Sequence, residues 1–181
     1  MSKVILDLCG GTGSWSKPYK ENGYDVKIID IKDGGDVRLF EKPNYNIYGI
    51  LAAPPCTHLA SSGARWWKEK GEDALLEALS VVDACMRIIK ITKPKFWALE
   101  NPVGRLVHYL GKPKMYFNPC DYGDPWTKKT CLWGEFNEPP KAPVEPTEGS
   151  KMHKLPPSEN RSKLRSITPP GFANAFYQAN K

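Results

Sequence analysis

The fold of this 181-residue chain is indicated by a stretch near its N-terminus, Val4-Ile5-Leu6-Asp7-Leu8-Cys9-Gly10-Gly11-Thr12-Gly13. A short apolar run, of the kind that forms a buried strand, leads directly into a turn with three glycines. Glycine lets the backbone turn tightly and approach a ligand without a clash at Cβ. In open α/β sheets, ligands bind beyond the carboxyl ends of the strands, where such turns lie. The stretch therefore predicts an α/β fold with a ligand-binding turn at residues 7–13.

Strand and helix patterns alternate along the next hundred residues. Three more segments have the composition of buried strands, namely Val26–Ile31, Ile47–Ala53 and Lys95–Leu99. A helix is expected over Ser14–Glu21, and a longer one over Glu72–Lys90, where apolar residues repeat every three or four positions. Strands separated by helices indicate βαβ units, and hence a mostly parallel sheet flanked by helices.

Composition divides the chain into three parts. Residues 1–138 carry the strand and helix patterns and predict one catalytic, cofactor-binding domain. Residues 139–168 are rich in proline and basic residues, which predicts an extended, basic segment. Residues 169–181 contain three aromatic residues and predict a short C-terminal helix that docks on the same domain.

The charge of the chain favours an anionic partner. The net charge is +6, and residues 139–181 hold seven basic and three acidic side chains, so +4 of it lies there. Such an excess suits nucleic acid, although ordinary solubilising charge is the alternative. No apolar run approaches the length of a membrane span and no signal-peptide pattern is present, which predicts a cytoplasmic protein with no membrane partner. Five dispersed cysteines without a CxxC motif predict reduced thiols and no metal site.

Two acidic positions after the glycine turn favour an adenosyl ligand. The turn alone fits a dinucleotide, S-adenosylmethionine or plain turn geometry, and it lacks the Lys-Ser/Thr pair of a phosphate loop. Asp30 ends the second strand at the separation where an acidic side chain meets ribose hydroxyls. Asp36, followed by Val37, is able to place a carboxylate near an adenine amino group. Each acid alone suits a loop cap, but the combination favours an adenosyl group.

Two further strand ends carry reactive side chains. Ala53-Pro54-Pro55-Cys56 leaves a buried strand, and its two prolines hold the thiol in a fixed direction. A thiol presented in this way is a nucleophile if its pKa is lowered, whereas a small buried cysteine is the alternative. Glu100 ends the next strand, where burial would raise the pKa of its carboxyl and make it a proton donor. Helix capping is the alternative for Glu100.

The set of motifs resembles the DNA (cytosine-5) methyltransferases over about residues 4–133. The order of four motifs is that of the family: Asp7–Gly13, Gly35-Asp36-Val37, Pro54-Pro55-Cys56 with Gly63, and Glu100-Asn101-Pro102. Tyr122-Gly123-Asp124-Pro125 is similar to the family's later Tyr-Gly-x-Pro-Gln-x-Arg-x-Arg segment. Trp126 replaces the glutamine of that segment, and Lys128 and Thr130 replace its two arginines.

The resemblance implies a Rossmann-like fold that uses S-adenosylmethionine as its cofactor. It implies that Cys56 adds to carbon 6 of cytosine while Glu100 assists at N3, so that carbon 5 accepts the methyl group. A base in duplex DNA leaves the stack to reach such a thiol. The cofactor residues it implies are Asp7, Leu8, Cys9, Gly10, Gly11, Thr12, Gly13, Asp30, Asp36, Val37 and Pro54. The expected substrate-binding residues are Pro55, Asn101, Arg65, Lys128 and Lys129.

The chain departs from the family mainly in length. Family members insert a sizeable target-recognition region before their last helix, and here only a Pro-rich basic stretch follows Trp133. We therefore expect DNA to be held through its phosphates with relaxed sequence specificity. Compact forms of this kind resemble phage proteins, which would place this one in the host cytoplasm. Methylation or related alkylation of a free pyrimidine nucleotide, and a catalytically idle adenosyl-binding module, are the alternatives.

Overall fold

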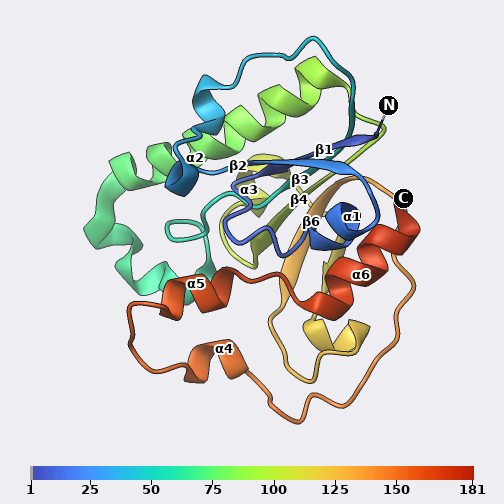
Figure 1. Ribbon diagram of the computed structural model, residues 1–181. Helices are drawn as coiled ribbons and strands as arrows, with labels where there is room; N and C mark the ends of the chain where they lie inside the picture. Colours follow the sequence, from blue (N-terminus) through green and yellow to red (C-terminus); the bar gives the residue numbers. More distant parts are fainter. Residues whose placement is uncertain (1) are drawn as a thin grey trace.

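The computed structural model describes residues 2–181 and has a six-stranded sheet with helices on both faces (Figure 1). The strand order is β2-β1-β3-β4-β6-β5. The strands are β1 (Val4–Leu8), β2 (Asp25–Ile29), β3 (Ile47–Ala52), β4 (Phe96–Pro102), β5 (Met115–Phe117) and β6 (Thr130–Glu135). Strands β1–β4 run parallel to one another, and β6 is antiparallel to both β4 and β5. The predicted α/β fold with a mostly parallel sheet is confirmed.

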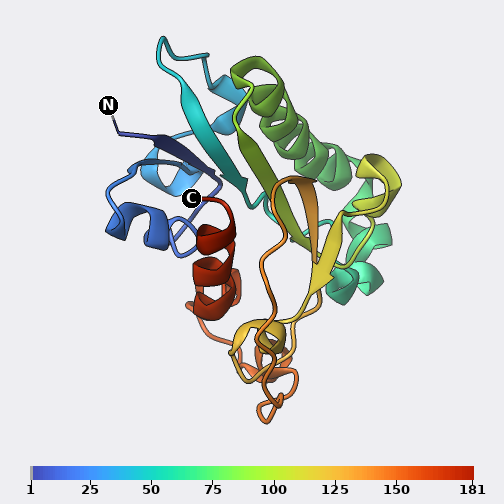
Figure 2. The same ribbon diagram turned by 90° about the vertical axis from the view of Figure 1, so that its right-hand side faces the viewer.

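Helices cover the sheet unequally. The α-helices are α1 (Lys17–Glu21), α2 (Trp67–Thr92), α3 (Val107–Leu110), α4 (Lys151–Lys154), α5 (Arg161–Ser166) and α6 (Pro170–Ala179). Four short 3₁₀ helices are η1 (Ile31–Asp33), η2 (Val37–Leu39), η3 (Ser61–Trp66) and η4 (Pro119–Tyr122). Figure 2 shows α2 on one face of the sheet and α6 on the other. None of these helices, within residues 2–181, is long and apolar enough to cross a membrane.

The two faces of the sheet form two separate cores, as the alternation of side chains along a strand requires. Leu6 and Leu8 of β1 belong to the core under α2, with Val82 and Ile88 of that helix. Ile5 points to the opposite face, into an aromatic core with α1 and α6. Within that second core, Phe172 of α6 stacks on Phe117 with 3.8 Å between ring centroids.

The long helix α2 is broken at Gly71. Gly71 has φ 75° and ψ −175°, so the turn Trp67–Lys70 is not continuous with the helix that follows. The helix predicted over Glu72–Lys90 corresponds to the part after this break, which packs on the sheet. The part before it extends η3 and belongs to the loop that follows Cys56.

Residues 139–168 are docked on the domain, although their composition favours an extended segment. Their backbone pairs with the stretch around η4: Val144 N donates to Cys120 O at 2.8 Å and Thr127 N donates to Gly149 O at 2.8 Å. The segment also forms the two short helices α4 and α5, which Figure 1 shows between the long connection after β6 and helix α6. Proline-rich sequence here gives an irregular but hydrogen-bonded path, because the partners are supplied by a distant segment.

Candidate active site and cofactor pocket

The carboxyl ends of the parallel strands bring the predicted site residues to one edge of the sheet. Leu8 at the end of β1 is in register with Ile29 of β2 and Ala52 of β3, and Ala52 is in register with Leu99 of β4. The glycine turn, Asp30, the Cys56 loop and Glu100 therefore all start from neighbouring positions. This is the edge at which open α/β sheets bind ligands.

The glycine turn closes around a buried carboxyl. Asp7 is 1% exposed, and Ser16 Oγ donates to its Oδ2 at 2.5 Å, while Oδ1 has no hydrogen-bond partner. A Cβ on Gly10 would overlap this carboxyl, so only glycine lets the turn pass so close. Burial and the neighbouring charge of Asp30 raise the pKa of Asp7 to about 7, against the lowering effect of Ser16.

Asp30 holds the turn from the adjacent strand. Its Oδ2 accepts a hydrogen bond from Gly11 N at 2.9 Å, and its Oδ1 accepts one from Lys32 N at 3.0 Å. A carboxylate offers about four acceptor positions, so the two that remain are available to a ligand in the turn. Together with the unpartnered oxygen of Asp7, these acceptors fit a ligand that carries hydroxyl or amine donors.

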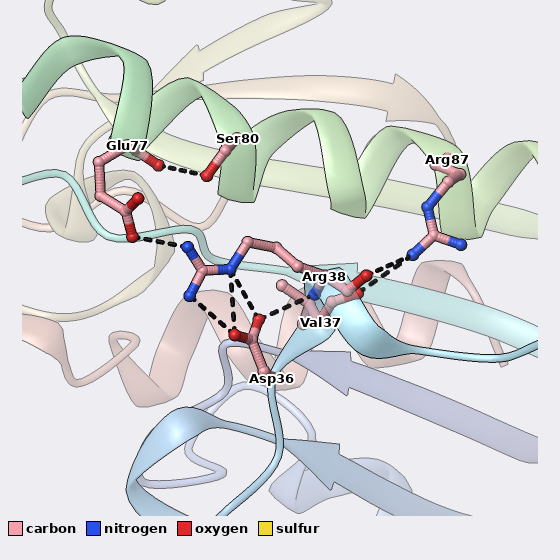
Figure 3. A network of polar contacts seen from close by, with 6 residues as sticks. All are labelled: Asp36, Val37, Arg38, Glu77, Ser80 and Arg87. Carbon is pink, nitrogen blue, oxygen red and sulfur yellow. Dashed lines mark hydrogen bonds and ion pairs between the residues drawn. The ribbon is translucent and has the colours of Figure 1, made fainter. Parts of the chain in front are cut away.

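Asp36 is engaged by a network that the sequence did not reveal (Figure 3). Its carboxylate accepts hydrogen bonds from Arg38 N at 2.9 Å and from the Arg38 guanidinium at 2.7–3.0 Å, and these bonds lower the pKa of Asp36. Arg38 also pairs with Glu77 of α2 at 2.6 Å, while Arg87 donates to the Arg38 carbonyl at 3.2 Å. Val37 lies buried in the core. A ligand at this end of the site meets a carboxylate that is already bound.

Contacts between two loops place Cys56 beside Glu100. Asn101, fully buried at the end of β4, donates from Nδ2 to Pro54 O at 2.9 Å. Farther along the same loops, Ser61 N donates to Val103 O at 2.8 Å, and Arg105 Nε donates to His58 O at 2.8 Å. Three hydrogen bonds thus join the segment after Glu100 to the loop that contains Cys56.

Gly104 permits the closest approach of these two loops. It forms a bridge with Ala60, and a Cβ at this position would overlap the carbonyl of Leu59. Since that neighbour is backbone, any side chain would have to push the Cys56 loop away. Arg105 adds a second anchor, because its guanidinium lies 4.4 Å from the centroid of the Trp67 ring.

Opposing charges surround the thiol. Burial, and next the negative charge of Glu100, raise the pKa of Cys56, while the positive charges of Lys128 and Arg165 lower it. Burial also raises the pKa of Glu100, and the charge of Lys128 lowers it. Lys128 Nζ donates to Arg165 O at 3.0 Å. The site therefore contains a thiol, a carboxyl and two cations, of which Arg165 was hidden in the basic tail.

The remaining predicted substrate residues lie on different segments around Cys56 and Glu100. Pro55 is exposed next to Cys56. Arg65 is exposed in η3, and its guanidinium lies over the ring of Trp66 at 5.0 Å. Lys129 is exposed beside Lys128, with its ammonium 5.2 Å from the centroid of Tyr116. Among residues 2–181, no three His, Cys, Asp or Glu side chains are grouped so that they could hold a metal ion.

Comparisons with known proteins point to one family. The family model for C-5 cytosine-specific DNA methylases matches residues 14–115, a range that includes Cys56 and Glu100. A relative from Frog virus 3 (isolate Goorha), described as a DNA (cytosine-5)-methyltransferase, is 28% identical over 152 residues. That match covers 73% of this chain and 70% of the viral protein.

Two further relatives are longer than this chain. The type II methyltransferase M.DdeI of Desulfomicrobium norvegicum is 23% identical over 171 residues, covering 71% of this chain and 39% of that protein. A solved structure described as a DNA modification methyltransferase encoded within a prophage (E. coli) superimposes with a TM-score of 0.51 at 18% identity. It covers 80% of this chain, which spans 53% of that one. At that identity the likeness supports the Rossmann-like methyltransferase fold alone.

Proposed function

This chain belongs to the family of C-5 cytosine-specific DNA methylases, and on that premise we propose that it methylates carbon 5 of cytosine in DNA through a covalent adduct with Cys56. The observation that carries the proposal is the hydrogen bond from Asn101 to Pro54 O, which ties the Cys56 loop to the end of β4 and brings the Cys56 thiol and the partly buried Glu100 carboxyl together. A protein that only bound an adenosyl ligand would need neither group.

Cys56 supplies the nucleophile. Carbon 5 of cytosine is a poor nucleophile until a group adds at carbon 6. When the thiolate forms a bond from Sγ to carbon 6, the electron pair of the ring double bond moves toward carbon 5. Pro54 and Pro55 fix the direction of the side chain before the base arrives.

Glu100 supplies the proton. Its raised pKa keeps a fraction of the carboxyl protonated, so that it is able to donate to N3 as the thiolate adds. After methyl transfer the carbon 5 proton leaves to solvent, the bond from Sγ to carbon 6 breaks, and the N3 proton returns to Glu100. The thiolate and the carboxylic acid are thereby regenerated.

The glycine turn fits an adenosyl cofactor. S-adenosylmethionine, when bound, supplies the methyl group. We assign Asp7 and the turn from Leu8 to Gly13 to the amino-acid part of this ligand, since the unpartnered Asp7 oxygen lies beside the turn, whose Gly11 and Gly13 have positive φ. Asp30 offers its two remaining acceptor positions to the ribose hydroxyls. Asp36 and Val37 would border the adenine, and Pro54 would close the pocket on the side of β3.

DNA is the proposed macromolecular partner. A cytosine in a duplex has to leave the stack to reach Cys56. The exposed Arg65 and Lys129 and the half-buried Lys128 are cations that suit phosphates. Asn101 and Pro55 would lie next to the target cytosine. Because residues 139–168 fold against the domain around η4, no large recognition region is present there, which supports relaxed sequence specificity.

The same observation supports a second candidate, a free pyrimidine nucleotide. A site that is bordered by residues 139–168, and not by a large recognition region, could accept a single nucleotide as readily as a base flipped out of DNA. The experiment that separates the two incubates the protein with labelled S-adenosylmethionine and either DNA or dCMP, followed by mass spectrometry of the nucleosides. We expect 5-methylcytosine from DNA with the native chain and none with Cys56→Ala.

A covalent trap tests the mechanism independently. In the presence of S-adenosylmethionine, DNA that contains 5-fluorocytosine should form a stable adduct with the native chain only, since after methyl transfer fluorine cannot leave carbon 5 as a proton does. Serine at position 56 should also fail to form it. Turnover by Cys56→Ala would contradict the covalent mechanism, and methylation of dCMP without methylation of DNA would select the nucleotide.

A further inference from the structure

A second group of cations lies at the edge of the sheet opposite the proposed active site. A hollow of about 480 Å³ has three exposed lysines in its wall, namely Lys95, Lys114 and Lys181. Lys95 immediately precedes β4, so the hollow lies at the amino end of this parallel strand, whereas Glu100 lies toward its carboxyl end. At about 3.3 Å per residue, the length of the strands separates the two edges by roughly 15–20 Å.

Aromatic rings hold these lysines in one cluster. Lys114 Nζ lies 4.6 Å from the ring centroid of Phe136 and donates to the Phe136 carbonyl. Lys95 Nζ lies 5.8 Å from the ring centroid of Tyr48, and Lys3 Nζ lies 4.1 Å from the same centroid. A ring face attracts an ammonium group without neutralising it. We call the four exposed lysines the basic edge, which consists of Lys3, Lys95, Lys114 and Lys181.

Little negative charge opposes the basic edge. Among the side chains that line the hollow, Glu135 is the one carboxylate. Asp25, at the start of the neighbouring strand β2, is paired with Lys27 at 3.2 Å. In the part of the chain that the structure describes, none of the four lysines forms an ion pair. Four cations beside one carboxylate suit a polyanion.

We propose that the basic edge is a second DNA-binding surface, which contacts the phosphates of a DNA segment other than the one that presents a cytosine to Cys56. Lysines already cover the faces of Tyr48 and Phe136, so the contacts are made to phosphates and not by stacking on bases. Phosphate contacts of this kind carry no sequence information. The inference goes beyond the proposed function, because binding at this edge requires no methyl transfer.

A nucleic-acid backbone suits the basic edge better than a single nucleotide. Lys3 lies outside the wall of the hollow and is connected to it through the ring of Tyr48, so the cations continue beyond the hollow. Successive phosphates of one strand are able to contact such a row, and each contact releases counterions. The chain would then hold two DNA segments at once, one at each end of its parallel strands.

The test counts the duplexes that one chain binds. We use a labelled duplex of about 10 base pairs, because DNA of this length is a stiff rod that cannot wrap from one edge of the protein to the other. Sedimentation velocity at low salt gives the stoichiometry of the native chain and of Lys3→Gln/Lys95→Gln/Lys181→Gln. Lys114 is left in place, since its bond to the Phe136 carbonyl contributes to folding.

Two further triple variants separate position from charge. The first has arginine in place of the same three lysines, which keeps the cations at the basic edge. The second is the matched control Lys17→Gln/Lys20→Gln/Lys90→Gln, which removes the same charge from exposed positions on α1 and α2.

We expect two duplexes on the native chain, on the arginine variant and on the control, and one duplex on the glutamine variant of the basic edge. The slope of log affinity against log salt for the second duplex should contain about 0.9 for each phosphate contact, or about 2.7 for the three lysines together. Adduct formation with 5-fluorocytosine DNA should keep its native rate in the glutamine variant, because none of these lysines lies at the Cys56 edge.

Three results would overturn the inference. They are a native chain that binds one duplex, a second duplex that is lost equally in the control, and a second duplex that polyglutamate displaces at a lower concentration of charge than competitor DNA does. The last result would identify the partner as an acidic protein.

Failure of the proposed function has a different signature. If the native chain binds two duplexes, loses one in the glutamine variant and forms no adduct with 5-fluorocytosine DNA, the second surface stands and the proposed chemistry is wrong. If it forms the adduct but binds one duplex, the proposed function stands and the basic edge is not a DNA-binding surface.

Discussion

Asn101 donates a hydrogen bond from Nδ2 to Pro54 O at 2.9 Å, and this contact joins the end of β4, which carries Glu100, to the turn that presents Cys56. The two residues are 47 positions apart in the chain. The contact is buried, so water cannot replace the lost partner if one side is removed. The relative placement of the proposed nucleophile and proton donor therefore depends on Asn101.

Replacement of Asn101 by alanine should lower the stability of the protein and leave its affinity for the cofactor unchanged. Leaving the carbonyl of Pro54 without a donor in a buried position should lower the free energy of unfolding by about 1–3 kcal/mol, measured by denaturant titration. It should also slow adduct formation with 5-fluorocytosine DNA, while the affinity for S-adenosylmethionine in calorimetry stays close to the native value. Exposed Asn44→Ala is the control. An unchanged adduct rate in Asn101→Ala would show that the contact does not position the thiol.

Glu100→Gln should change the pH dependence of the reaction as well as its rate. Addition needs a protonated Glu100 and an ionised Cys56, and the pKa of each is raised by burial. The rate of adduct formation should therefore rise with pH as the thiol ionises and fall again as Glu100 loses its proton. Glutamine cannot transfer a proton, so we expect a loss of about 10²–10⁴-fold and no alkaline fall in what remains. An alkaline fall that persists in Glu100→Gln would assign it to another group.

The sequence predicted the parts of this molecule that local signals specify. The glycine turn, the alternation of strands and helices and the apolar stripe over Glu72–Lys90 depend on residues that are close in the chain, and the structure has each of them. Gly71, where the helix is broken by a positive φ, directly precedes Glu72, the first residue of the helix that the apolar repeat predicted. Local patterns thus predicted the order of strands and helices and the edge of the sheet at which the proposed site lies.

Contacts between distant segments account for what the sequence could not show. Asp36 stays a proposed adenine contact, and the sequence did not show that its carboxylate is held by Arg38, whose other partner is Glu77 of α2. The proline-rich tail was expected to be extended, but its hydrogen-bond partners are residues around η4. What composition and periodicity do not contain is the partner on another segment, which is Glu77 for Arg38 and the residues around η4 for the tail.

Asp7 should make the stability of the protein depend on pH. Its pKa is about 7 in the folded chain against 3.8 for a free carboxyl, so between these values the folded state keeps a proton that the unfolded state has lost. The contribution of this group to stability is therefore complete below about pH 4 and is lost as the pH rises to about 7. At about 1.4 kcal/mol per pKa unit, the upper limit of the loss is about 4 kcal/mol.

Denaturant titrations at several pH values check this effect. Asp7→Asn should be more stable than the native chain at pH 8 and should show a flatter dependence between pH 4 and pH 7, since an amide does not ionise. Asp33→Asn, at an exposed position, is the control and should keep the native dependence. If Asp7→Asn falls in stability as steeply as the native chain over that range, another group is responsible.

DNA held through its phosphates should bind with little sequence preference and a steep dependence on salt. Lys129 and Lys163 are exposed cations on two different segments beside the site, next to Lys128 and on α5, respectively. If each contacts one phosphate, Lys129→Gln and Lys163→Gln should each reduce the slope of log affinity against log salt by about 0.9 in duplex DNA or about 0.7 in single strands, equally for all sequences. Exposed Lys90→Gln on α2 is the control and should leave the slope unchanged. Native slopes in both variants, together with a loss of transfer to dCMP, would instead place these lysines at a nucleotide site.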